Sequence, residues 1–226
     1  MECQSNINSR MRSILVDWLV DVHLKFHLIP ETLYLTINIL DRFLEKQNIQ
    51  RTQLQLAGIT ALLLASKYEE IYPPQVSDMV GICDDAFNDD EIIAMEVKIL
   101  RTLKYKITIP SAHVFLLRYL KAGHGNKKIV QLSSYILDST LQNYDLLEFL
   151  PSQLASAAVM IARKKVGRNA WSPTLLKYTN YSEEDILPVA RAIVEAMRSD
   201  YSNPGAIERK YSRERFGCVA GTAFTI

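Results

Sequence analysis

Cysteine is scarce in this chain of 226 residues: only Cys3, Cys83 and Cys218 occur, and they lie far apart. Their odd number and wide spacing provide neither a disulfide framework nor a metal-binding pattern. We therefore expect a reducing, intracellular compartment.

Long apolar runs are also missing, because no stretch reaches the ~20 residues that a membrane-spanning helix needs. The N-terminus lacks a basic segment followed by an apolar core and a small-residue cleavage site, so we expect no secretory signal. The sequence predicts a soluble intracellular protein that does not interact with membranes.

No charge of one sign dominates the chain: 26 lysines and arginines oppose 25 aspartates and glutamates, for a net charge of +1. A nucleic-acid-binding surface normally needs a basic stripe or a high isoelectric point. The balance therefore argues against nucleic acid as a partner.

Motifs of catalysis are absent as well. The chain has no G-x-S-x-G elbow, Walker loop or dinucleotide fingerprint. His23 and His27 have the i, i+4 spacing of a metal pair, but Leu-Lys-Phe lies between them and no third ligand is evident. We expect no metal, no cofactor and no enzymatic activity.

Helical periodicity dominates what is present, and β-type alternation is essentially missing. Ser9 and Thr52 are candidate N-caps, and capping-box patterns begin at Asn88 and at Ser182. The expected helices cover residues 9–27, 30–47, 52–70, 76–83, 88–102, 111–122, 127–142, 152–166, 174–178 and 182–199.

These ten helices divide into two halves that indicate an internal repeat. The segment LLLASK at 62–67 aligns with VMIARK at 159–164, and small residues precede both. Small residues at intervals of three and four are typical of a helix packed closely on several sides. We expect domains over 1–108 and 109–200, then a tail over 201–226 that holds a short solvated helix packed on the outside and then a loose end.

The segment 11–26, MRSILVDWLVDVHLKF, is apolar almost all the way round a helix. Such a helix is either enclosed by others or offers part of itself to a partner. Arg12 lies in this apolar setting, and a buried guanidinium needs a carboxylate, which Asp41 on the next helix can supply. We interpret this pair as structural, so that removal of either partner disturbs the first fold.

MRSILVDWLVDVH together with LLLASKYEEIYPP at 62–74 resembles the cyclin box of A- and B-type cyclins. The resemblance extends from about Asn8 to the C-terminal tail and suits either class. It implies an all-α protein with two tandem five-helix cyclin folds and a short helical C-terminal tail. It also implies a regulatory subunit that binds and activates a cyclin-dependent protein kinase, as a heterodimer in the nucleus and cytoplasm.

Lys67 has two interpretations. From composition it is a snorkelling lysine at the end of a buried helix. The resemblance instead implies that it pairs with Glu96 and that the pair hydrogen-bonds the kinase backbone. The kinase-binding residues implied in this way are Leu64, Lys67, Tyr68, Glu70, Glu96, Leu100, Tyr105 and Ile107.

The apolar stripe of the first helix is usually read as core. The resemblance implies a shallow groove that docks Arg-x-Leu motifs of substrates and inhibitors, with Asp21 receiving the basic residue of the motif. The implied groove residues are Met11, Ile14, Leu15, Trp18, Asp21, Leu54 and Gln55. Phosphate docking by the second fold is not expected, because Leu117 stands where several B-type cyclins carry a basic residue.

One alternative shares the tandem fold. Transcription factor IIB is built from two such repeats and binds nucleic acid, which would require a basic face across both repeats. The near-neutral charge disfavours this alternative.

Overall fold

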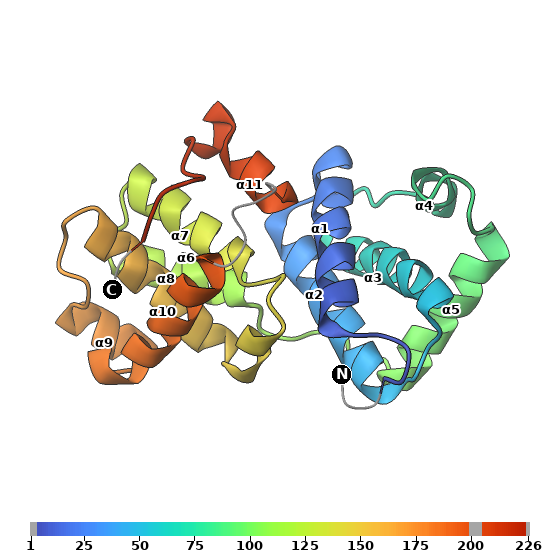
Figure 1. Cartoon of the computed structure of the whole chain (residues 1–226), viewed down its shortest axis with the longest axis horizontal. Coiled ribbons are helices and arrows are strands. Elements are labelled where there is room, and N and C mark those ends of the chain that lie inside the picture. The colour runs from blue at the N-terminus through green and yellow to red at the C-terminus, as the bar shows by residue number, and fades with distance from the viewer. Residues whose placement is uncertain (1–3, 199–204, 225–226) are drawn as a thin grey trace. The chain divides into compact units, whose positions relative to one another are not determined.

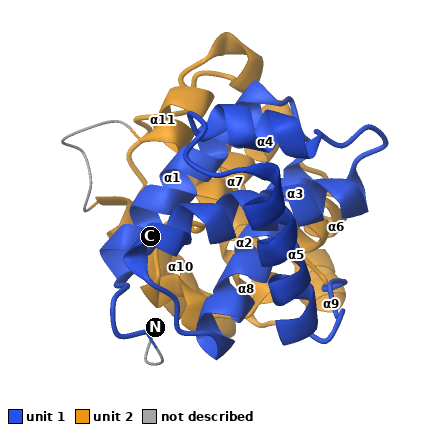
Figure 2. Ribbon diagram, turned by 90° about the vertical axis from the view of Figure 1, so that its right-hand side faces the viewer, with its two compact units in different colours: residues 1–109 blue, residues 110–226 orange. Residues whose placement is uncertain are grey.

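The computed structural model describes residues 4–198 and 205–224, and every regular element in these ranges is a helix. The chain divides into two compact units, residues 1–109 and residues 110–226 (Figure 2). The predicted fold class, all-helical with two tandem five-helix folds, is confirmed.

The first unit is built around a central helix, α3, which contacts the other four helices of the unit (Figure 1). Its helices are α1 (Ser9–Lys25), α2 (Pro30–Lys46), α3 (Leu54–Glu69), α4 (Val76–Ile82) and α5 (Asp89–Thr102), with a short 3-10 turn, Arg51–Gln53, before α3.

Small residues allow α3 to lie at the centre. Ala57, Ala61 and Ala65 are fully buried, and Gly58 receives the side chain of Leu15 from α1. A Cβ atom on Gly58 would come within 2.9 Å of both Leu15 Cδ atoms. The close approach of α1 to α3 therefore depends on the missing side chain.

The second unit has the same plan around α8, which contacts α6, α7 and α10. Ala155, Ala158 and Ala162 of α8 are fully buried, as the repeat predicted. The helices are α6 (Ala112–Ala122), α7 (Lys127–Ser139), α8 (Pro151–Lys165), α9 (Pro173–Thr179), α10 (Glu183–Arg198) and α11 (Ala206–Tyr211), with short 3-10 turns at Asp145–Glu148 and Glu214–Phe216.

Two of the four predicted N-caps are confirmed. Asn88 and Glu91 form a reciprocal capping box, with both N–H to side-chain distances at 2.9 Å. Ser182 and Asp185 form another, in which the hydroxyl and backbone N–H of Ser182 lower the pKa of the Asp185 carboxyl.

The other two starts were wrong by one or two residues. The first helix is capped by Asn8, whose side-chain oxygen accepts from the Met11 N–H at 2.9 Å, so Ser9 is already helical. Thr52 lies inside the 3-10 turn that precedes α3 and caps nothing.

The short helix predicted in the tail is present and packs on its unit, but it is not solvated as predicted. Ala206, Ile207, Lys210 and Tyr211 of α11 are buried, and α11 contacts α7. Lys210 Nζ lies 2.7 Å from Asp138 Oδ2 on α7, and the Tyr211 hydroxyl donates to the same oxygen at 2.8 Å. Desolvation together with the Asp138 charge raises the pKa of Tyr211 well above its usual value.

The remainder of the tail is not a loose end either. Phe224 is buried with its ring 6.3 Å from that of Tyr135, and Lys165 Nζ donates to the Ala223 carbonyl at 2.6 Å. We call residues 205–224 the C-terminal strap. This packing could not be predicted from the charged residues of the tail, because the partner of Lys210 and Tyr211 lies about 70 positions earlier.

Within the described residues, no helix has the length and apolar character needed to cross a membrane.

Candidate functional site

Lys67 and Glu96 lie together on the surface of the first unit. The Lys67 ammonium donates to both Glu96 carboxylate oxygens, at 2.7 and 2.9 Å. The pair joins the last turn of α3 to the middle of α5, and 43% of the Lys67 side chain remains accessible. The snorkelling interpretation is therefore incomplete, because the ammonium ends on a specific partner.

The Glu96 side chain is 15% accessible, so the pair lies at the surface, where solvent screens its charges and it adds little to stability. The ammonium has three donors, of which two are used, and each carboxylate oxygen keeps acceptor capacity. The pair can therefore donate to a carbonyl and accept from an N–H of another chain, and its two charges hold each other in a fixed position.

Exposed aromatic and apolar side chains surround the pair. Tyr68, next to Lys67, is 51% exposed, and its hydroxyl hydrogen-bonds Thr108. Tyr105 is 67% exposed in a left-handed backbone conformation. Leu100 and Ile107 are half-buried, whereas Leu64 is almost fully enclosed.

Sequence reasoning missed four exposed apolar residues in the same region. Ile71 and Tyr72 follow the end of α3 and are 87% and 91% exposed, and Ile93 and Val97 are exposed beside Glu96 on α5. For Ile93 and Val97 the sequence did contain a signal. They lie at i−3 and i+1 from Glu96, and apolar side chains at these positions indicate a helix face that is not wholly solvated.

Glu70 performs a structural task that the sequence did not reveal. Its Oε1 accepts from the Ile29 N–H at 2.8 Å and from the Thr32 hydroxyl at 2.5 Å. The start of α2 has no side-chain cap of its own, so Glu70 supplies one from the end of α3. Partial burial, together with Glu31 and Glu70, raises the pKa of the neighbouring Glu69.

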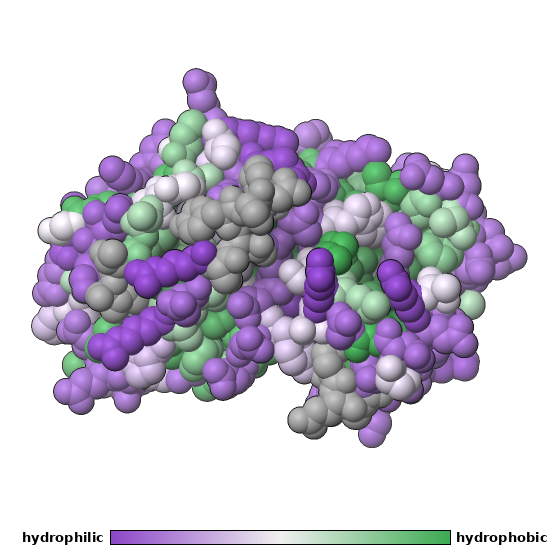
Figure 3. Space-filling model, in the orientation of Figure 1, coloured by the Kyte–Doolittle hydropathy of each residue, from purple (hydrophilic) through white to green (hydrophobic). Residues whose placement is uncertain are grey.

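The apolar stripe of α1 divides into accessible and enclosed residues. Ile14 is 64% exposed, Met11 and Trp18 are half-buried, and Asp21 is exposed. Hydrophobic side chains emerge over the middle of α1 between hydrophilic ones (Figure 3). Of the two alternatives considered for this helix, full enclosure is therefore excluded, because part of its apolar stripe is accessible.

The remaining groove residues lie deeper. Leu15 and Leu54 are each 6% exposed, and Leu15 packs on Gly58. Gln55 is half-buried one turn before Gly58 on α3. Leu15 is thus a core residue beneath the accessible stripe, rather than part of its exposed edge.

The Arg12–Asp41 ion pair is present in the interior of the first unit. The guanidinium is fully buried and bonds both carboxylate oxygens, at 2.6 and 2.7 Å. Such a bidentate pair compensates the charge that α1 carries into its packed face, which supports the structural interpretation.

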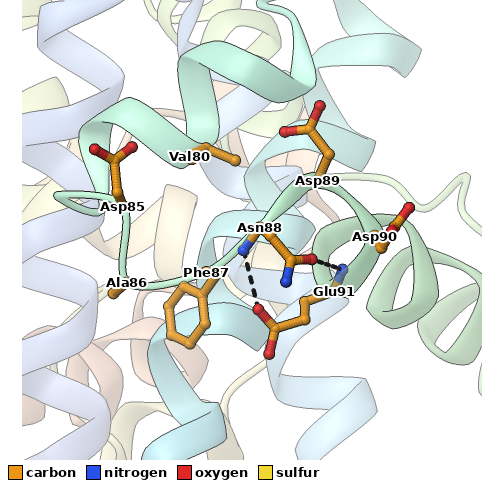
Figure 4. Close-up of a pocket in the computed structure, with 8 residues that line it drawn as sticks. All are labelled: Val80, Asp85, Ala86, Phe87, Asn88, Asp89, Asp90 and Glu91. Atoms are coloured by element: carbon orange, nitrogen blue, oxygen red, sulfur yellow. Dashed lines mark hydrogen bonds between the residues drawn. The ribbon is translucent and has the colours of Figure 1, made fainter.

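A separate pocket of about 550 Å³ lies between α4 and α5 and contains none of the predicted residues (Figure 4). Its polar groups include the capping box of Asn88 and Glu91, whose hydrogen bonds the helix start already uses. Among the described residues no three His, Cys, Asp or Glu side chains are grouped as metal ligands.

The family of the chain follows from comparison with known proteins. Residues 1–108 match the cyclin N-terminal domain and residues 110–223 match the cyclin C-terminal domain. The chain belongs to the cyclin family, which decides between the two tandem-fold families considered from the sequence.

Its relatives include proteins named as B-type cyclins. The chain is 41% identical over 222 residues to Cyclin-B2-2 of Oryza sativa subsp. indica, which covers 97% of the chain and 53% of the relative. It is 45% identical over 217 residues to the G2/mitotic-specific cyclin-B of Hydra viridissima, covering 96% and 55%. The chain thus spans about half the length of the curated relatives it matches.

Solved structures share the fold. A viral cyclin from herpesvirus saimiri superposes with a TM-score of 0.78 at 22% identity, covering 88% of this chain and 89% of the viral one. A chain of the yeast RNA Pol II CTD kinase CTDK-1 complex superposes with a TM-score of 0.70 at 14% identity, covering 85% and 67%.

Proposed function

We propose that this chain is the kinase-binding part of a B-type cyclin, and that it activates a cyclin-dependent protein kinase in cell-cycle control. The observation that carries the proposal is the exposed Lys67–Glu96 pair with apolar side chains around it. The pair stabilises its own fold little, and apolar side chains lie around it. This arrangement is typical of a protein–protein interface in which a few polar contacts fix the partner's position.

The mechanism is conformational. The first unit presses on the C-helix of the kinase and holds it inward, which completes the lysine–glutamate pair of the kinase and reorders its activation segment. All catalytic groups belong to the kinase, so this chain is not itself an enzyme. The setting is nuclear and cytoplasmic, in keeping with three cysteines too few and too scattered for a disulfide framework.

A second surface recruits substrates and inhibitors. The accessible stripe of Met11, Ile14 and Trp18 docks Arg-x-Leu motifs, and Asp21 at its end receives the basic residue. The relatives named as mitotic cyclins and the geometry of α1 support this assignment.

Loss of the charged pair tests the first surface. Lys67→Ala and Glu96→Ala should each weaken kinase binding by about tenfold or more, as truncation of a central polar contact does. Kinase activity on a short peptide measures activation, and calorimetric binding measures affinity. Helical content and melting temperature should stay nearly unchanged, because the pair is exposed.

Lys46→Ala and Glu45→Ala provide matched controls, since both residues are exposed on α2. Normal activation by Lys67→Ala and Glu96→Ala would refute the assignment of the pair. Unfolding of both variants would make the pair structural instead.

The docking surface is tested with Arg-x-Leu peptides, which should bind with Kd on the order of micromolar because a shallow groove leaves much of the ordering cost uncompensated. Met11→Ala combined with Trp18→Ala should abolish binding and reduce kinase activity only on substrates with the motif. Asp21→Ala should lose several-fold, and less at high salt.

Leu176→Ala, a truncation of an exposed leucine in the second unit, serves as the control. If the peptide still binds the Met11→Ala/Trp18→Ala variant, the α1 stripe is not the docking surface and its residues serve only the core.

A further inference from the structure

The near-neutral charge of the chain conceals opposite charges on its two units. Residues 1–109 contain 11 basic and 15 acidic side chains, whereas residues 110–226 contain 15 basic and 10 acidic ones. The net charges are therefore −4 and +5. The overall net charge of +1 therefore does not describe the second unit.

The positive charge of the second unit is concentrated in two stretches without any acidic residue, 119–137 and 149–182. The first covers the end of α6 and most of α7, and the second covers α8 and α9. The stretches meet in space, because the Arg163 guanidinium on α8 donates to the Gly123 carbonyl at the end of α6, at 2.6 Å.

Six exposed cations gather at this junction of the α6–α7 turn with the end of α8. We call them the basic end: Lys121, Lys127, Lys128, Lys164, Lys165 and Arg168. Within residues 4–198 and 205–224, none of them forms an ion pair; Lys165 bonds only the Ala223 carbonyl.

Arg163, beneath the basic end, shows the same excess of positive charge. It is 7% exposed, and its Nε and Nη1 donate to the carbonyl oxygens of Asn169 and Gly123 rather than to a carboxylate. Desolvation lowers the pKa of Arg163, and the charge of Arg168 lowers it further. An anion at this position would reduce that repulsion.

We propose that the basic end is a docking surface for a short acidic segment of a partner protein, a run of aspartates and glutamates. Three elements contribute cations over one end of the unit, so a peptide with several carboxylates can meet several of them at once. A short segment suffices, because the six cations lie on neighbouring elements at one end of the unit. This surface is distinct from the kinase-contacting pair and from the α1 stripe.

The test uses the chain alone, so its outcome does not depend on kinase activation. The probe is a fluorescent peptide of about twelve residues with alternating Glu and Ser, and its control carries Gln in place of Glu. Fluorescence anisotropy should show binding of the Glu peptide only. Affinity should fall by about tenfold or more from ~0.1 M to ~1 M salt, where the Debye length shrinks from ~10 Å to ~3 Å.

Lys127→Glu combined with Lys128→Glu is the informative variant. Both residues lie in the first turn of α7, where acidic side chains stabilise a helix, so the variant should fold at least as well as the parent. It should lose most of the binding, and Arg168→Glu should lose several-fold. Lys46→Glu with Arg51→Glu makes an equal charge change in the first unit and should bind like the parent.

Equal binding of the Glu and Gln peptides, or unchanged binding by the Lys127→Glu/Lys128→Glu variant, would overturn the proposal. A duplex oligonucleotide that binds the basic end more tightly than the Glu peptide at the same salt concentration would overturn it too, in favour of nucleic acid.

Discussion

At the scale of single residues, burial decides which chemistry a side chain retains. Arg12 is charged, fully buried and matched by Asp41, whereas Arg163 is nearly as buried and is matched only by carbonyl oxygens. The two arginines look alike in the sequence. The charge of Arg12 is neutralised by the carboxylate of Asp41 at a helix–helix contact. The charge of Arg163 is not neutralised by a carboxylate, so it adds to the positive potential of the nearby surface.

Cysteine reactivity follows the same rule. Cys83 is 4% exposed, and burial together with the nearby Asp84 raises the pKa of its thiol to about 11. At pH 8 only about one thiol in a thousand is then a thiolate. In a Cys3→Ser/Cys218→Ser variant, Cys83 should resist a disulfide-exchange reagent until denaturant is added.

Restoring Cys218 to that variant supplies the control, because Cys218 is exposed and should react promptly in the native protein. Rapid modification of Cys83 in the native state would show that α4 opens readily.

At the scale of helices, close packing in the first unit depends on one missing side chain. Gly58→Ala adds helix propensity to α3 but drives a Cβ atom into Leu15, so the overpacking cost of about 1–3 kcal/mol should exceed the gain of about 1 kcal/mol. Urea unfolding should show a net loss of stability.

Gly81→Ala is the matched control, since a Cβ atom at that position of α4 meets nothing within 4 Å. It should raise stability by about 0.5–1 kcal/mol. Equal effects of the two substitutions would mean that α1 can move away from α3 at little cost.

At the scale of the whole molecule, the C-terminal strap is part of the second unit rather than an appendage. Asp138 accepts from both Lys210 and Tyr211, and all three side chains are buried. Asp138→Ala leaves an uncompensated ammonium in the interior and should cost about 3–5 kcal/mol. Thermal unfolding of the chain measures the loss.

Replacing the pair by apolar residues, Asp138→Leu with Lys210→Met, should restore much of this stability, because no buried charge then remains. If the single and the double variants were equally unstable, the strap would be held by the aromatic contacts of Tyr135 rather than by the ion pair.

The charge asymmetry belongs to this scale as well. A net charge of +1 excludes a strongly basic protein but not a basic end on one unit. Only the meeting of α6, α7 and α8 brings the six cations into one surface.

The sequence alone determined the helical class, the two tandem units, the central helices α3 and α8, and the pairs Arg12–Asp41 and Lys67–Glu96. Periodicity and small-residue spacing are local properties. The need of a buried guanidinium for a carboxylate predicted Arg12–Asp41, and the cyclin resemblance predicted Lys67–Glu96, each across 29 positions. Local rules also placed the capping boxes of α5 and α10.

Tertiary structure decided the rest. Glu70 caps α2 from 41 positions away, Leu15 turns inward onto Gly58, and Lys210 finds Asp138 across 72 positions. None of these contacts has a signature in the neighbouring residues, because a charged side chain in a sequence is equally compatible with solvent and with a buried partner. Packing chooses between the two, since burial is tolerated only where a partner compensates the cost of desolvation.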